Sequence, residues 1–106
     1  MVNTVAQGEI LRLEKPAMYV LVLSKDFFNR SGMAVVCPVF MTADPDALHL
    51  PVFTDGFSGI ALLEQLRALD LRSRYFSHIG QLSFGQIQEV SDAVQSIFEY
   101  YPYTLL

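Results

Sequence analysis

The chain has 106 residues and a net charge of −4 at pH 7, a length that forms one domain around a single core. Hydrophobic residues make up 52% of the sequence and charged residues only 17%. This composition excludes intrinsic disorder and leaves apolar surface for an interface between subunits. The single cysteine, Cys37, excludes an internal disulfide, and no Cys or His spacing indicates a metal site. We therefore expect neither a metal nor another cofactor.

The sequence shows no targeting or membrane-spanning segment. Residues 1–8 lack a basic region followed by an apolar run, and no apolar stretch approaches the ~20 residues that a spanning helix needs. We expect a cytoplasmic protein. The negative charge argues mildly against nucleic-acid binding, but Arg67, Arg72 and Arg74 form a local basic cluster. That cluster is either a solubilising loop or a phosphate-binding surface.

The first part of the chain alternates short extended runs with turns. Gly8–Glu14 alternates apolar and polar residues, which predicts a strand with one buried face. Ala17–Ser24 is nearly all apolar, which predicts a strand buried on both faces. Lys25–Gly32 reads as a turn with a short helical piece. Met33–Met41 is the next strand, and Pro38 within it favours a bulge or an edge position.

The middle of the chain continues in the same way. Thr42–Ala47 has the composition of a loop, Leu48–Phe53 that of a short strand, and Thr54-Asp55-Gly56 that of a turn. The periodicity of Gly59–Leu66 fits a helix or a strand, and the turn before it favours a strand. Ser77–Leu82 is a further short strand.

The last element is an amphipathic helix. Ser83 and Gln86 form a capping box, in which the serine hydroxyl and the glutamine side chain satisfy backbone groups of the first turn. Pro102 ends the helix. One apolar stripe follows the box and comprises Ile87, Val90, Val94, Ile97, Phe98 and Tyr101. The sequence thus predicts an α+β fold, a small SH3-like β-barrel of 5–7 mostly antiparallel strands with a C-terminal amphipathic helix.

An ordered set of short motifs runs along the chain. The motifs are Gly8-Glu9-Ile10, Val20–Ser24 followed by Phe28–Arg30, Val35–Pro38, Glu64–Asp70 after Gly59, and Gly80–Ser83. In this order and spacing they resemble the MazF/PemK family (Kid/CcdB-like) of toxins from type II toxin–antitoxin systems. The resemblance covers about residues 8–100, so all of 1–106 is expected to be one toxin domain.

The resemblance implies a dimerising toxin barrel held inactive by a cognate antitoxin. MazF- and Kid-like members are metal-independent endoribonucleases that cut single-stranded RNA at short sequences (mRNA interferases). In that reaction the 2′-hydroxyl attacks its own phosphate, so a base, an acid and a stabilising cation are needed. Only RNA carries the required hydroxyl.

The chain departs from the family at two expected catalytic positions. Met18 stands where the family has an arginine, and Phe40 stands at the threonine of the "PxT" segment. Lys15, three residues before Met18, offers a replacement cation. A phenyl ring at Phe40 stacks on bases but transfers no proton.

Other family positions keep their polar character. Glu64 occupies the acidic position of the "DQ" motif, so the resemblance implies that Glu64 and Lys15 are catalytic. It also implies that Arg67, Arg74 and Phe40 bind RNA. The residues alone leave other interpretations open: Glu64 is also typical of a carboxylate facing water, and Arg67 of an ion-pair partner of Asp70 or Glu64.

Three functions remain open from the sequence. The first is an RNA-cleaving toxin, and the second is a degenerate member that keeps the fold without catalysis. The third is a CcdB-like gyrase poison, which acts through its last residues; this chain ends in Tyr100–Leu106 without tryptophan. His49 and His78 are possible general bases or histidines satisfied by neighbours.

Overall fold

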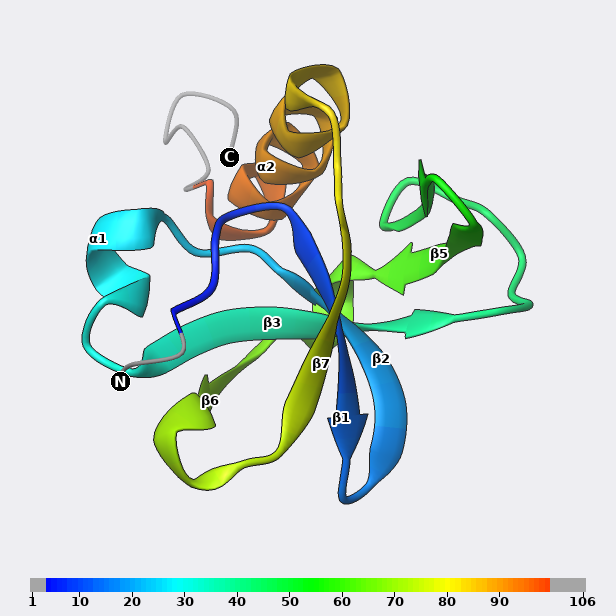
Figure 1. The fold of residues 1–106 in the computed structure, drawn as a ribbon. Coiled ribbons are helices and arrows are strands. Elements are labelled where there is room, and N and C mark those ends of the chain that lie inside the picture. The colour runs from blue at the N-terminus through cyan, green and yellow to red at the C-terminus, as the bar shows by residue number, and fades with distance from the viewer. Residues whose placement is uncertain (1–3, 100–106) are drawn as a thin grey trace.

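Seven strands and one long helix make up most of the computed structural model, which describes residues 4–99 (Figure 1). The strands are β1 (Glu9–Glu14), β2 (Ala17–Val22), β3 (Met33–Phe40), β4 (His49–Thr54), β5 (Phe57–Leu62), β6 (Arg67–Asp70) and β7 (Phe76–Gln81). The helices are α1 (Asp26–Asn29) and α2 (Phe84–Phe98), with two 3₁₀ turns, η1 (Leu63–Gln65) and η2 (Leu71–Ser73). The predicted α+β class and C-terminal helix are confirmed.

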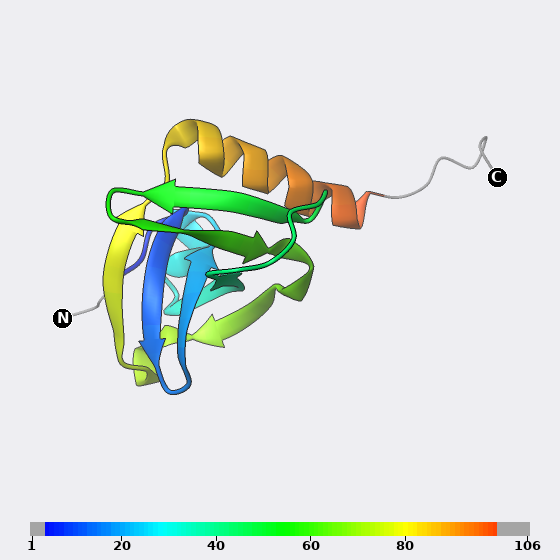
Figure 2. The ribbon, with the colours of Figure 1, turned by 90° about the vertical axis from the view of Figure 1, so that its right-hand side faces the viewer.

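All strand pairs are antiparallel and belong to one sheet. The order is β4-β5-β3-β2-β1-β7, and β6 pairs with β3 beside β5. The sheet curls strongly, and α2 lies across one side of it (Figure 2). The result is a half-barrel, with β4 and β7 at the two ends of the strand order.

The predicted strand Gly59–Leu66 is wrong beyond Leu62. The chain there enters the 3₁₀ turn η1 and leaves it as β6, which the sequence analysis did not predict. This short turn lets β5 and β6 pair successively with β3, at its C-terminal and N-terminal halves respectively. The segment that was predicted as one strand thus holds the end of one strand and a 3₁₀ turn, and a second strand follows it.

Pro38 occupies neither a bulge nor an edge strand, contrary to the prediction. The Leu23 N–H donates to the Val35 carbonyl, so Val35 is in a hydrogen-bonded pair with β2. Hydrogen-bonded and non-hydrogen-bonded pairs alternate along an antiparallel ladder, so the nitrogen of Pro38, three residues later, points away from β2. On that other side, pairing with β6 ends at Val36 and pairing with β5 begins at Val39. The missing N–H of Pro38 therefore falls in the gap between two partner strands.

The predicted strand Ala17–Ser24 ends at Val22. Ser24 instead closes the turn that follows, because its hydroxyl donates to the Asn29 side chain at 2.5 Å and accepts from the Val35 N–H at 2.9 Å. The other predicted strands differ from the observed ones by a residue or two at their ends.

The two faces of the sheet each cover a hydrophobic core. The first contains Val5, Leu11, Leu13, Val20, Val22, Ala34, Val36, Leu69 and Leu71. The second contains Ile10, Leu21, Cys37, Val39, Val52, Ala61, Leu63, Leu82 and Val90. Successive residues such as Val20 and Leu21 belong to different cores, as the pleat requires. The helix α2 packs on the second core.

Only part of the predicted helical stripe packs on the sheet. Val90 is buried, whereas Ile97 is 38% and Phe98 67% exposed. Tyr101 and Pro102, which were predicted to extend and end the helix, lie outside the described residues. The second half of α2 therefore presents apolar side chains to solvent.

The capping box forms only in part. The Ser83 hydroxyl accepts from the Gln86 N–H, as predicted. The Gln86 carboxamide, however, bonds the backbone of Phe53: it accepts from the N–H at 3.0 Å and donates to the carbonyl at 3.1 Å. A side chain thus takes the place of a neighbouring strand at the edge of β4.

Most of the outer edge of β4 is occupied. Its outward-facing backbone positions are His49, Pro51 and Phe53, because these residues form the non-hydrogen-bonded pairs with β5. The His49 N–H donates to the Asp46 carbonyl at 3.3 Å, Pro51 has no N–H, and Gln86 takes the N–H of Phe53. Another strand cannot add to this edge without breaking these bonds.

Candidate active site

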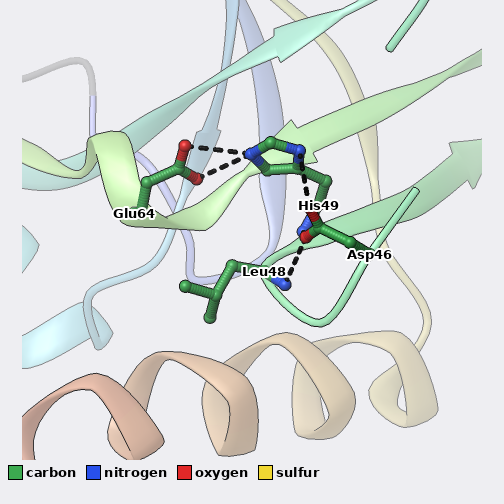
Figure 3. Close-up of polar contacts among 4 residues, drawn as sticks. All are labelled: Asp46, Leu48, His49 and Glu64. Atoms are coloured by element: carbon green, nitrogen blue, oxygen red, sulfur yellow. Dashed lines mark hydrogen bonds and ion pairs between the residues drawn. The ribbon is translucent and has the colours of Figure 1, made fainter. Parts of the chain in front are cut away.

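A histidine and a glutamate meet where β4 begins and β5 ends. The hairpin register pairs His49 with Leu62, and η1 turns Glu64, two residues later, toward the imidazole. The His49 Nε2 atom lies 2.9 Å from Oε2 and 3.0 Å from Oε1 of Glu64 (Figure 3). Hairpin register and 3₁₀ turn together position this pair.

A second carboxylate lies on the other side of the imidazole. The Asp46 Oδ2 atom is 3.4 Å from His49 Nδ1. Figure 3 shows the two carboxylates on opposite sides of the ring. Asp46 is itself fixed, because its Oδ1 atom accepts from the N–H groups of Leu48 and His49 at 2.9 and 3.0 Å. Only the imidazolium form of His49 can donate to both carboxylates.

The charges of this cluster shift the pKa values in opposite directions. The hydrogen bond with Glu64 is the main cause that raises the pKa of His49 above 6.5, and the charge of Asp46 adds to it against desolvation. The same hydrogen bond lowers the pKa of Glu64 below 4.5. Each group thus favours the charged form of the other.

Phe40 shares a face of the sheet with His49. Phe40 pairs with Ile60, Leu62 lies two residues further along β5, and His49 pairs with Leu62. Directly paired residues point to the same face, and so do alternate residues of one strand. The exposed Phe40 ring therefore lies on the side of the sheet that carries His49.

Arg67 belongs to the same face. It pairs with Val36, which lies four residues before Phe40 on β3. The alternatives of an ion pair with Asp70 or Glu64 are wrong, since Asp70 pairs with Arg72 and Glu64 with His49. Among residues 4–99, none of the ion pairs includes Arg67.

An open hollow of about 560 Å³ lies beside the cluster of Asp46, His49 and Glu64. Asp44 is part of its wall, and the backbone of Asp44 adds to the causes that raise the pKa of His49. Phe40 is 46% exposed next to it. The hollow is lined by Met41, Thr42, Ala43, Asp44 and Ile60. It offers room for a ligand close to the acid–base pair.

The other two predicted site residues lie elsewhere, close to each other. Lys15 is in the turn between β1 and β2, and its carbonyl accepts from Arg74 Nη1 at 3.3 Å. Glu64, by contrast, contacts His49 of β4. The structure thus joins Lys15 to Arg74 and Glu64 to His49.

Cys37 adds no reactive group to the site. Burial, together with the charge of Glu64, raises the pKa of the Cys37 thiol to about 12, so this thiol stays protonated and unreactive.

Within the described part of the chain, no group of three or more His, Cys, Asp or Glu side chains is arranged to hold a metal ion. Among residues 4–99, no helix is long and apolar enough to cross a membrane.

The sequence matches the family of PemK-like, MazF-like toxins of type II toxin–antitoxin systems over residues 13–98. The chain belongs to this toxin family. No curated protein sequence matches it significantly.

Solved structures of MazF proteins share the fold. A chain of the MazE–MazF complex (Form-I) from Deinococcus radiodurans has a TM-score of 0.81 and 25% identity, covering 92% of this chain and 98% of that chain. An endoribonuclease from a mycobacterial species has a TM-score of 0.80 at 14% identity, with coverage of 96% and 99%. An endoribonuclease in complex with its cognate antitoxin, also mycobacterial, has a TM-score of 0.77 at 14% identity, covering 92% and 99%.

Met18 and Phe40, the two positions at which the resemblance led us to expect an arginine and a threonine, lie at the same end of β2 and β3. The register of β2 with β3 ends at the pair Tyr19 and Val39; Met18 precedes Tyr19 on β2, and Phe40 follows Val39 on β3. Met18 packs against the first core, and Phe40 is exposed. This end of the two strands thus carries two apolar side chains.

His49 is the member of the site that the sequence analysis left unassigned. The signal that identifies it is the two-residue turn Asp55–Gly56, which closes the β4–β5 hairpin with Gly56 at φ +80°. Counting back from this turn pairs His49 with Leu62, close to Glu64. His78, the other candidate base, lies on β7 at the other end of the strand order and contacts the carboxylate of Glu9.

Proposed function

We propose that this toxin is a metal-independent, sequence-specific endoribonuclease that cleaves single-stranded RNA with the His49–Glu64 pair. The observation that carries the proposal is the position of Glu64 at 2.9 Å from an imidazole whose other nitrogen faces Asp46. Cleavage by the 2′-hydroxyl needs one group that takes a proton and one that gives a proton. Glu64 and His49 hold these two states side by side.

The proton balance of the step closes within the pair. Glu64 takes the proton of the 2′-hydroxyl while the 2′-oxygen bonds to phosphorus. His49 gives its Nε2 proton to the 5′-oxygen as the bond from phosphorus to that oxygen breaks. The products are a 2′,3′-cyclic phosphate and a 5′-hydroxyl. One proton then passes from Glu64 to His49 along their hydrogen bond, which restores carboxylate and imidazolium.

Two residues on the same face support the reaction. Arg67 supplies positive charge for the phosphorane-like transition state, because no acidic partner consumes its charge among the described residues. Phe40 offers an exposed ring on which a base stacks beside the hollow. Asp46 keeps the imidazole oriented and charged.

The test uses a long unstructured RNA in EDTA. The wild-type chain should produce discrete fragments with 2′,3′-cyclic phosphate ends, and His49→Gln and Glu64→Gln should each lose at least about a hundredfold in rate. The matched control is Asp55→Asn, which removes an exposed carboxylate from the β4–β5 turn. Equal rates in all variants would remove the pair from the mechanism.

The second candidate is a family member that acts by binding alone. Its support is the apolar pair Met18 and Phe40, which replaces the expected arginine and threonine. Intact RNA at high protein concentration, in folded and monodisperse samples, would establish this function against the first. The third function, a gyrase poison, would depend on the last residues, and Tyr100–Leu106 lie outside the described residues.

The partners follow from the same proposal. We expect a cognate antitoxin, since similar structures include a MazE–MazF complex and an endoribonuclease with its antitoxin. We also expect a cytoplasmic homodimer, for which the exposed aromatic side chains of α2, such as Phe98, supply apolar contact area.

A further inference from the structure

The Glu64 carboxylate is closed onto His49 in the structure. Both of its oxygens approach the same nitrogen, since His49 Nε2 lies 3.0 Å from Oε1 and 2.9 Å from Oε2 (Figure 3). This nitrogen carries at most one proton, so the two oxygens share a single donor. The acid and the base of the proposed reaction therefore bind each other, and each occupies the hydrogen-bonding position that a substrate atom would need.

The proposed reaction requires the two groups to be apart. A general base and a general acid each lie about 2.6–3.2 Å from the oxygen that they serve. The attacking 2′-oxygen and the leaving 5′-oxygen lie on opposite sides of the phosphorus atom, roughly in line. A phosphate that reacts between Glu64 and His49 therefore holds them more than about 5 Å apart, the length of those two hydrogen bonds. The contact of 2.9 Å describes the site before the phosphate enters.

The two partners are anchored to different degrees. His49 belongs to β4, its side chain is 25% exposed, and Asp46 faces its second nitrogen at 3.4 Å. Glu64 lies on the three-residue turn η1, and its side chain is 39% exposed. Within the part of the chain that the structure describes, His49 is the only side chain that binds the Glu64 carboxylate. When the contact opens, Glu64 therefore moves away and His49 stays in place.

A phosphate diester competes with Glu64 for the same donor. The diester carries one negative charge, as the carboxylate does, and its oxygens accept hydrogen bonds from an imidazolium. Asp46 holds the imidazole from the other side while the exchange takes place. Arg67, which lies on the same face of the sheet, adds positive charge that attracts the phosphate.

We propose that Glu64 is a built-in competitor of the substrate phosphate: it closes the resting site by occupying His49 Nε2, and binding of a phosphate diester displaces it. This inference rests on the proposed function and deepens it, because it gives the catalytic base a second role in controlling access to the acid. The resting contact is thus an autoinhibitory one, which the substrate itself releases.

The first measurement is affinity at about pH 5.5 for a short fluorescent single-stranded RNA. Its 2′-hydroxyls are methylated, so that it lacks the nucleophile. At this pH His49 is protonated even without Glu64, because the ordinary imidazole pKa is 6.5, and Glu64 is ionised, because its pKa is lowered below 4.5. A change in affinity therefore reports competition for the imidazolium and not loss of its charge.

Replacing Glu64 should strengthen binding. Glu64→Gln and Glu64→Asp should each bind the probe about two- to fivefold more tightly than the wild type, because the probe no longer breaks an exposed ion pair. Glu64→Asp keeps the charge but is one methylene group shorter, so it separates loss of the contact from loss of the charge. The control is Asp55→Asn, which removes a carboxylate from the β4–β5 turn and should leave the affinity unchanged. Circular dichroism verifies that each variant is folded.

The second measurement follows the Glu64 carboxyl carbon by NMR during a pH titration. The hydrogen bond with His49 is the main cause that lowers the pKa of Glu64 below 4.5. In concentrated dimethyl phosphate, a diester without bases, this pKa should rise toward 4.5, because the hydrogen bond is broken and a negative charge lies nearby. Sodium chloride at the same ionic strength is the control and should leave the pKa lowered.

Several outcomes overturn the inference, even if the wild-type chain cleaves RNA. These are a pKa of Glu64 that stays the same in dimethyl phosphate, and affinities of both Glu64 variants that do not exceed that of the wild type. A gain in Glu64→Gln alone also overturns it, since the charge and not the contact would then oppose the probe. Tighter binding by both variants of a chain that cleaves nothing would support the inference and contradict the ribonuclease proposal instead.

Discussion

At the scale of single residues, the charge of the His49 imidazole depends on two neighbouring carboxylates. Two carboxylates face its two nitrogens, and the closer one, Glu64, is the larger cause of its raised pKa. Protonation of His49 and ionisation of Glu64 are therefore coupled. The pair stabilises the fold only where both charges are present.

The first prediction concerns this coupling. In Glu64→Gln the pKa of His49 should fall toward 6.5, because the neutral amide no longer favours the imidazolium. NMR titration of the imidazole signals measures the shift. Asp55→Asn, the control, should leave the titration unchanged. An unaltered His49 pKa in Glu64→Gln would contradict the geometry described here.

The same pair fixes the sign of a pH effect on stability. A raised pKa for His49 stabilises the fold below pH 6.5, and this contribution is lost as pH rises through the raised value. A lowered pKa for Glu64 stabilises the fold above pH 4.5, and this contribution is lost as pH falls. The melting temperature of Glu64→Gln should thus be lower than that of the wild type near pH 6. The two melting temperatures should converge near pH 9.

The sequence carried only half of this site. Glu64 was identified through a motif, since it sits in a contiguous stretch that resembles the family. Its partner lies fifteen residues earlier and is joined to it by a hairpin register and a 3₁₀ turn. Single-residue periodicity predicts which face His49 occupies, but not which side chain approaches it from η1.

At the scale of secondary-structure elements, the N-terminus of α2 is tied to the edge of β4. Gln86 bonds both the N–H and the carbonyl of Phe53. The capping box was predicted from local spacing, whereas this link needed the third dimension: Gln86 and Phe53 are 33 residues apart. Local patterns therefore predicted where the helix begins, and the fold decided what its first turn binds.

The second prediction tests this link. Gln86→Ala should lower the free energy of unfolding by about 1–3 kcal/mol, because two hydrogen bonds of roughly 0.5–1.5 kcal/mol each are lost. The amide of Phe53 should also exchange its hydrogen faster. Gln88→Ala, on the exposed side of the same helix, is the control. Full protection of the Phe53 amide in Gln86→Ala would rule out the hydrogen bond between Gln86 and Phe53.

At the scale of the whole molecule, the curl of the sheet brings its first and last strands together. Thr54 ends β4 and Gly80 lies in β7, the two strands at opposite ends of the order. A Cβ atom at Gly80 would lie 2.5 Å from Thr54 Oγ1 and 2.8 Å from its Cβ. The Thr54 hydroxyl oxygen is buried without a hydrogen-bond partner in the described structure. Close contact, not strand pairing, thus closes the half-barrel here.

This closure shows how far the sequence alone could predict the architecture. The run of short strands and the amphipathic stripe behind Ser83 predicted the fold class and the terminal helix. Gly80 was noted only as part of the Gly80–Ser83 motif, and nothing local indicates that its missing side chain makes room for Thr54. Contacts between distant strands depend on the curl, which arises from twist accumulated over the whole sheet.

The third prediction follows from that contact. Gly80→Ala should destabilise the fold by about 1–3 kcal/mol, because the added methyl group forces β7 and β4 apart. Adding Thr54→Ala should restore part of the loss, since it removes two of the three contacting atoms and an unpartnered hydroxyl. Gly85→Ala, in the open first turn of α2, should instead stabilise by about 0.5–1 kcal/mol. Urea unfolding measures all three, and equal effects at Gly80 and Gly85 would show that the ends of the sheet do not meet.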